Sequence, residues 1–105
     1  MKKANYQIKT KDGPKEVSGV SNGIFGVHGE RGWWTVTELT SGLAVHPEYQ
    51  SWHRTRNTKA QACKFATLLS TNPPFPWWMF VEGQLTGRQV ERMQDFRIEC
   101  SRAIA

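Results

Sequence analysis

The pattern of hydrophobic residues changes near Pro47, and this change constrains the fold more than any other feature. Before it, apolar and β-branched residues alternate with polar ones in short runs separated by turn residues, which is typical of strands. After it, apolar residues recur every three or four positions, which is typical of helices. A length of 105 residues is common for one domain. We expect a single α+β domain over residues 1–105: a small antiparallel meander of four to five strands followed by two helices packed on one face.

Turn residues predict where the strands end. Asn22-Gly23 predicts a two-residue hairpin turn, since such a turn needs positive φ at both positions. Strand-like residues run over 24–28 and 33–39, and a turn at 40–42 leads into a short strand over 43–45.

Two capping boxes predict where the helices begin. Thr58 with Gln61 opens the first helix, which ends before the prolines of 72–76. Thr86 with Gln89 opens the second. Their predicted apolar faces are Ala62, Phe65, Ala66 and Leu69 for the first, and Val90, Met93, Phe96, Cys100 and Ala103 or Ile104 for the second.

Two pairs of adjacent tryptophans stand out. Neighbouring residues of a strand point to opposite faces, so Trp33 and Trp34 cannot both enter a core on one side of a sheet. Trp77 and Trp78 begin an apolar segment, 77–81, that fits either a buried strand or the start of a helix. An exposed indole forgoes about 1.5–3 kcal/mol of burial. It therefore predicts a partner surface, a covering segment of the same chain or a second protomer, and a homodimer is an open alternative.

The charge is positive and unevenly spread. The formal net charge is +5, and the whole excess lies in the first 64 residues. The segment from Tyr49 to Lys64 contains no acid. Such a mixture of cations and aromatic rings suits nucleic acid or an acidic protein groove, although an ordinary solvated surface has the same composition. The predicted partner-binding residues are Trp33, Trp34, Trp52, His53, Arg54, Arg56 and Lys59.

Catalytic and metal-binding patterns are weak. The three histidines and two cysteines lack the paired spacing of a zinc site, so we expect no metal and no cofactor. Cys63 lies near a predicted helix start, where a thiol pKa can fall, and a small enzyme built on Cys63 and a histidine is the third-ranked hypothesis. We expect no enzymatic activity.

The segment 34–45, WTVTELTSGLAV, followed by Thr58-Lys59-Ala60-Gln61-Ala62 at a helix start, resembles small accessory proteins of phages, prophages and plasmids. Some small phage proteins of this size block host defence complexes, as anti-CRISPR proteins do. The resemblance implies a binding role and assigns no residue to it.

We therefore expect a non-catalytic, phage or mobile-element protein that docks on a host protein or nucleoprotein complex, such as a nucleic-acid-directed defence machine, and inhibits or modulates it. The alternative is a direct DNA- or RNA-binding protein that uses the same basic and aromatic surface. The polar start and the lack of an apolar run of about 18 residues predict no membrane association and a cytoplasmic location, in the host cell if the chain is phage-encoded.

Overall fold

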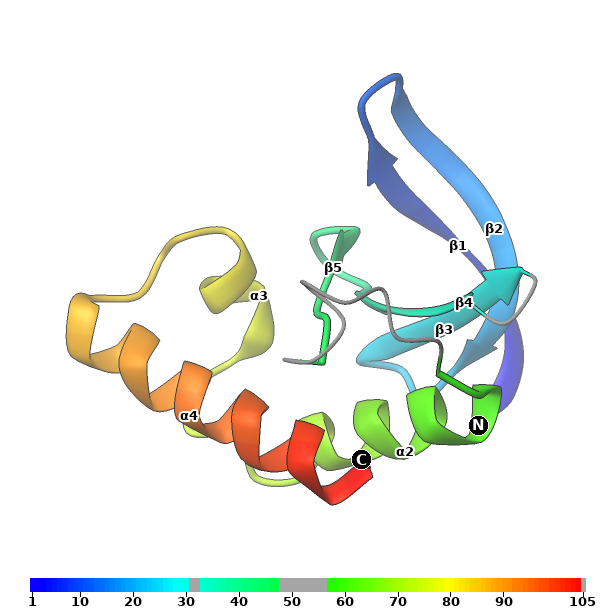
Figure 1. The fold of residues 1–105 in the computed structure, drawn as a ribbon. Coiled ribbons are helices and arrows are strands. Elements are labelled where there is room, and N and C mark those ends of the chain that lie inside the picture. Colours follow the sequence, from blue (N-terminus) through cyan, green and yellow to red (C-terminus); the bar gives the residue numbers. More distant parts are fainter. Residues whose placement is uncertain (31–32, 48–56, 105) are drawn as a thin grey trace.

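The described part of the chain folds into a five-stranded antiparallel sheet and three helices (Figure 1). This computed structural model describes residues 1–30, 33–47 and 57–104. The strands follow chain order across the sheet, which confirms the predicted meander and the α+β class. They are β1 (Lys2–Thr10), β2 (Gly13–Ser21), β3 (Phe25–Glu30), β4 (Trp33–Glu38) and β5 (Leu43–Ala44).

The turn between β2 and β3 forms where the sequence predicts it, but its type differs. Only Gly23 has positive φ there, at 91°, so the expectation of positive φ at Asn22 is wrong. The Asn22 side chain instead accepts hydrogen bonds from the backbone of Ile24 at 3.0 Å and of Phe25 at 2.8 Å. The Asn22 side chain thus stabilises a longer turn than the predicted two-residue one, because Asn side chains can hydrogen-bond backbone groups that follow them in a turn.

The β1–β2 hairpin bends away from the rest of the sheet. β1 and β2 pair along their whole length, whereas β2 pairs with β3 only at Val20–Val27 and Ser21–Gly26. The bend starts at Gly19, where a side chain would collide with the Val27 carbonyl. Beyond the bend the hairpin curls back, and the Lys9 N–H donates to the Gly42 carbonyl at 2.9 Å, next to β5. Figure 1 shows the hairpin projecting from β3 and β4.

This curl covers part of the sheet face that the helices leave open. The Tyr6 ring lies against Gly26, where a Cβ would approach ring atom Cε2 to 2.8 Å. The Tyr6 hydroxyl lies 3.1 Å from Nδ1 of His28. The Tyr6 ring, packed over Gly26, therefore forms a second, smaller packing layer on this face of the sheet.

The turn between β4 and β5 is organised by a buried carboxylate. Glu38 is 3% exposed and accepts backbone N–H groups from Thr40 at 2.9 Å and from Ser41 at 2.8 Å. Gly42 completes the turn with φ of 74°. Two charge-assisted hydrogen bonds offset the burial of the carboxylate.

The described helices are α2 (Lys59–Ser70), α3 (Trp77–Val81) and α4 (Gly87–Ile104). Helix α2 packs on β3 and β4, and α4 packs alongside α2 (Figure 1). The apolar segment that begins at Trp77 forms a helix, which settles the choice left open by periodicity. No helix in the described ranges combines the length and the apolar character needed to cross a membrane.

The observed apolar face of α2 agrees with the prediction, and that of α4 differs from it in how it ends. All four residues of the predicted α2 face are buried, and Thr58 with Gln61 forms the predicted capping box. In α4 the end of the stripe is Ile104 and not Ala103, which is exposed. At its start Gln89 accepts the Thr86 N–H at 2.9 Å, which is one half of the second box.

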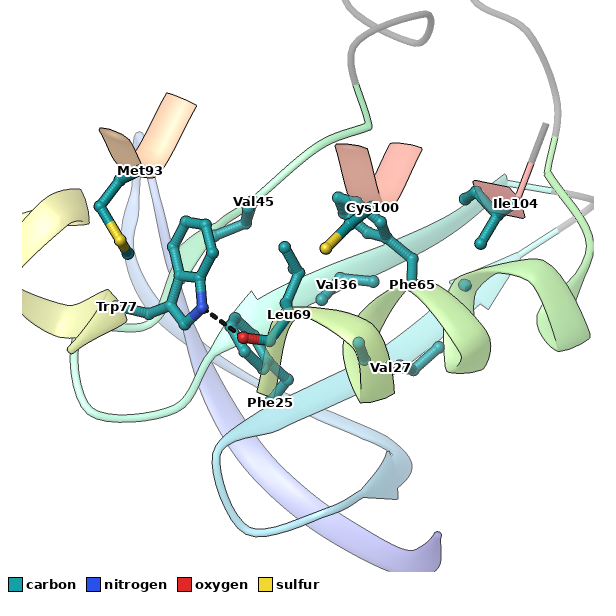
Figure 2. Packing of buried hydrophobic residues seen from close by; sticks show 12 residues of the cluster. Phe25, Val27, Val36, Val45, Phe65, Leu69, Trp77, Met93, Cys100 and Ile104 are labelled. Carbon is teal, nitrogen blue, oxygen red and sulfur yellow. Dashed lines mark hydrogen bonds between the residues drawn. The ribbon is translucent and has the colours of Figure 1, made fainter. Parts of the chain in front are cut away.

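Trp77 belongs to the cluster of buried hydrophobic residues (Figure 2). Its ring is 3% exposed and meets Phe25, Phe80 and Phe96 with centroid distances of 6.0, 5.4 and 6.2 Å. Its indole N–H donates to the Leu69 carbonyl at 2.6 Å. That carbonyl belongs to the last turn of α2, where no intrahelical donor is left, so the indole satisfies a group that burial would otherwise penalise.

Replacing Trp77 by Phe tests this role. The variant loses the indole hydrogen bond and leaves a cavity, so we expect the free energy of unfolding to fall by about 2 kcal/mol. Trp78→Phe is the matched control, because Trp78 is 40% exposed, and we expect it to change stability by less than about 0.5 kcal/mol. Urea denaturation of both variants measures the difference; equal stabilities would contradict the assignment.

A second prediction concerns Tyr6, because burial raises its pKa to about 12. A raised tyrosine pKa contributes stability that is fully present below pH 10 and is lost as pH rises toward 12. Absorbance at alkaline pH should show a late tyrosine ionisation near pH 12. Tyr6→Phe should lower the amplitude of this late phase and Tyr49→Phe should retain the contribution of Tyr6; an unchanged late phase in Tyr6→Phe would show that Tyr6 is not held as described.

Candidate functional site

The start of β4 presents one tryptophan on each face of the sheet. Trp33 is 41% exposed, whereas Trp34 is half-buried and packs against the core. The expectation that these two indoles diverge is therefore confirmed. Trp33 is the one left without full cover by the described part of the chain.

The Trp34 ring is held between a glycine and a lysine. A Cβ on Gly29, the cross-strand partner of Trp34, would lie 2.6 Å from ring atom Cδ2, so only glycine lets the indole lie across β3. The Lys59 ammonium lies 5.6 Å from the ring centroid. A cation over an indole at an exposed site contributes about 0.5–1 kcal/mol, which is small enough for a ligand to displace it.

Asn57 connects β4 to the start of α2. Its Oδ1 accepts the Trp34 N–H at 3.0 Å, and its Nδ2 donates to the Trp34 carbonyl at 2.9 Å. The side chain is 2% exposed and takes the place of a neighbouring strand at this position. Thr58, the next residue, caps α2, and Lys59 begins it. The two hydrogen bonds of the Asn57 side chain therefore fix the position of Lys59 relative to Trp34.

A groove of about 490 Å³ opens beside Trp34, between the β1–β2 hairpin and the start of α2. Ser18 donates to the Asn5 side-chain oxygen at 2.8 Å within it. Two of its described lining residues are lysines and none is acidic. We call it the Trp34 groove; it is lined by Lys3, Ala4, Asn5, Ser18, Gly19, Val20, Gly29, Trp34 and Lys59.

Three of the seven predicted partner-binding residues lie at this end of β4: Trp34 and Lys59 are in contact on one face of the sheet, and Trp33 lies on the other. The other four, Trp52, His53, Arg54 and Arg56, lie outside the described residues.

Sequence reasoning missed the β1–β2 side of the groove and the residue that fixes its other side. Lys3 lies opposite Val20, and Asn5 lies opposite Ser18. Pairing the first two strands through the turn before Gly13 would have placed Lys3 and Asn5 on one face, since alternate residues share a face. Asn57 lies 23 residues from its partner, and no local pattern marks such a contact.

The residues considered for catalysis or metal binding line no part of the Trp34 groove as far as they are described, and His53 lies outside the described residues. Burial raises the pKa of the Cys100 thiol to about 11, so it stays protonated at neutral pH. Cys63 is half-buried against the hydrophobic core. Burial and the nearby Arg97 lower the pKa of His46. Among the described residues no three His, Cys, Asp or Glu side chains converge on a metal position. The absence of enzymatic activity stays a prediction.

The Asn57 amide pair generates a stability prediction. Asn57→Ala leaves both backbone groups of Trp34 without these partners, so we expect a loss of about 2–3 kcal/mol. Asn5→Ala is the control, because it removes one exposed hydrogen bond and should cost less than about 0.5 kcal/mol. Thermal denaturation of the two variants tests the difference. A loss in Asn57→Ala no larger than that in Asn5→Ala would refute the role.

Comparison of the chain with family models, curated proteins and solved structures finds no match. The resemblance of segment 34–45 to phage and plasmid accessory proteins stays a prediction. The same holds for the expected host partner.

Proposed function

We propose that this chain is a non-catalytic binding protein that docks on a macromolecular complex and modulates it. The contact face is the end of the sheet at the start of β4, where Trp33 lies on one side of the sheet and Trp34 with Lys59 lies on the other. The observation that carries the proposal is the exposed Trp33 indole, 41% accessible, beside a second indole that already holds a cation.

The energetics of Trp33 favour a partner. Full burial of a large apolar side chain contributes about 1.5–3 kcal/mol, and Trp33, which is 41% exposed, leaves part of this for contact with a partner to recover. Trp is among the residues most enriched at the energetic centres of protein interfaces. The sheet could have placed a small polar residue at this position without loss to the core.

The charge distribution supports an anionic partner. The excess of basic residues lies in the first 64 residues, which include the contact face and both sides of the Trp34 groove. Arg54 and Arg56 add cations close to Asn57 along the chain. Such a surface attracts acidic proteins and nucleoprotein complexes from a distance.

Segment 34–45 bears on which kind of complex the chain binds. The similarity of segment 34–45 to accessory proteins of phages and plasmids supports a host defence complex as the target and an inhibitory effect. In this structure the segment forms most of β4, the Glu38 turn and β5, so the similarity concerns the element that presents Trp34.

Affinity capture with the tagged full chain tests the contact face. We expect Trp33→Ala to weaken capture of the partner by about 2 kcal/mol, or roughly thirtyfold, as for a central interface tryptophan. Lys59→Glu and the double reversal of Arg54 and Arg56 to Glu should also reduce it.

The controls separate this face from general stickiness and charge. Trp78→Ala removes another exposed tryptophan, and Lys11→Glu makes the same charge change at the tip of the β1–β2 hairpin. Both should capture the partner as the parent does. Capture that survives Trp33→Ala, or that falls equally in the controls, would contradict the proposal.

A further inference from the structure

The Trp34 groove combines an aromatic ring with two lysines, and it lies on the face of the sheet opposite to the exposed Trp33. We infer that it binds single-stranded nucleic acid, with one base against Trp34 and neighbouring phosphates at Lys3 and Lys59. This inference rests on the proposed function and names the chemistry that the partner presents at this site.

The size of the groove suits a nucleotide. Its volume of about 490 Å³ lies within the range of about 300–1,000 Å³ found for small-molecule sites. Gly19 and Gly29 line it, and the space that a Cβ would take is filled by the Val27 backbone at Gly19 and by the Trp34 ring at Gly29. The glycines thus let the chain pack closely here, and the indole is the surface that a base would meet.

The lysines are placed for a phosphate chain. Lys3 comes from β1 and Lys59 from the start of α2, so cations approach the groove from two elements. A neighbouring hollow of about 570 Å³ shares Lys3 and Ala4 with the groove and adds Lys2. Glu16, the one acid of β2, lines neither hollow. The two hollows together are lined by Lys2, Lys3 and Lys59 and by no described acidic residue.

The resting contact of Lys59 shows what a base would replace. The ammonium sits over the Trp34 ring, 5.6 Å from its centroid. A stacked base takes that place, and the flexible lysine moves to the adjacent phosphate. Stacking of one base on an aromatic side chain strengthens binding by about 5- to 150-fold, so the exchange favours the nucleic acid.

Polar groups beside the ring can contact a base edge. The Asn5 amide lines the groove, and its oxygen already accepts a hydrogen bond from Ser18. Its nitrogen carries N–H donors of the kind that meet base carbonyl and ring-nitrogen acceptors. An acidic peptide would satisfy the two lysines but would leave the indole unused, and for this reason we favour a nucleic acid.

Binding of a fluorescently labelled 15-nucleotide mixed-sequence single-stranded RNA or DNA to the full chain tests the inference. Anisotropy titrations at several salt concentrations should show affinity falling as salt rises. Lys3→Gln and Lys59→Gln should each lower the slope of log K against log salt by about 0.7, the value for one lost contact to a single strand. Lys11→Gln, at the hairpin tip, is the matched control and should leave the slope unchanged.

Trp34→Leu tests stacking. Leucine keeps apolar volume against the core but has no ring, so affinity should fall by about 5- to 150-fold. The parent should show quenching of tryptophan fluorescence on binding that this variant has lost. If Trp34→Leu proves misfolded by circular dichroism, the two exposed lysines decide, since neither is part of the core.

Three results would overturn the inference: no binding at low salt, an equal effect of Lys11→Gln, or equally tight binding of a labelled polyglutamate peptide. The last would assign the groove to an acidic protein. Capture of the partner that still depends on Trp33 would then leave the proposed function standing, whereas loss of both oligonucleotide binding and Trp33-dependent capture would remove both.

Discussion

The two hydrogen bonds between the Asn57 amide and the Trp34 backbone determine how the candidate site is assembled. They hold the start of α2 against β4. The Asn57 side chain is almost fully buried, and a buried amide without hydrogen-bond partners would destabilise the fold. From this fixed point the capping box sets the direction of α2, and the first helical residue, Lys59, comes to rest over the indole. The two buried hydrogen bonds of Asn57 thus determine the geometry of the Lys59–Trp34 pair at the surface.

Glycines decide the shape of the rest of the sheet. Gly19 lets the β1–β2 hairpin cross close to β3, Gly26 leaves room for the Tyr6 ring, and Gly29 does the same for Trp34. An aromatic ring lies over a missing side chain in the last two cases, one on each face of the sheet. The curl of the hairpin therefore creates both a second packing layer and one wall of the Trp34 groove.

Features that depend on local spacing could be predicted from the sequence. The strand order, the apolar face of α2 and its capping box follow from period and from residues three positions apart. So does the divergence of Trp33 from Trp34, because strand alternation is local. The predicted turn type at Asn22 was wrong, because hydrogen bonds from the backbone to the Asn22 side chain stabilise a different turn. Lys3 and Asn57 were missed because their roles arise from contacts between distant segments.

The position of β1 at the margin of the sheet has one more consequence. Within the described ranges β1 has a paired strand on one side only, so its outer backbone groups face outward except near Lys9, whose N–H donates to the Gly42 carbonyl. Such a margin can recruit the same strand from another molecule and start aggregation. Lys2, Lys3 and Lys9 lie along it, and their mutual repulsion keeps two margins apart. Acylating these amines would remove that repulsion and leave concentrated solutions prone to strand-by-strand association.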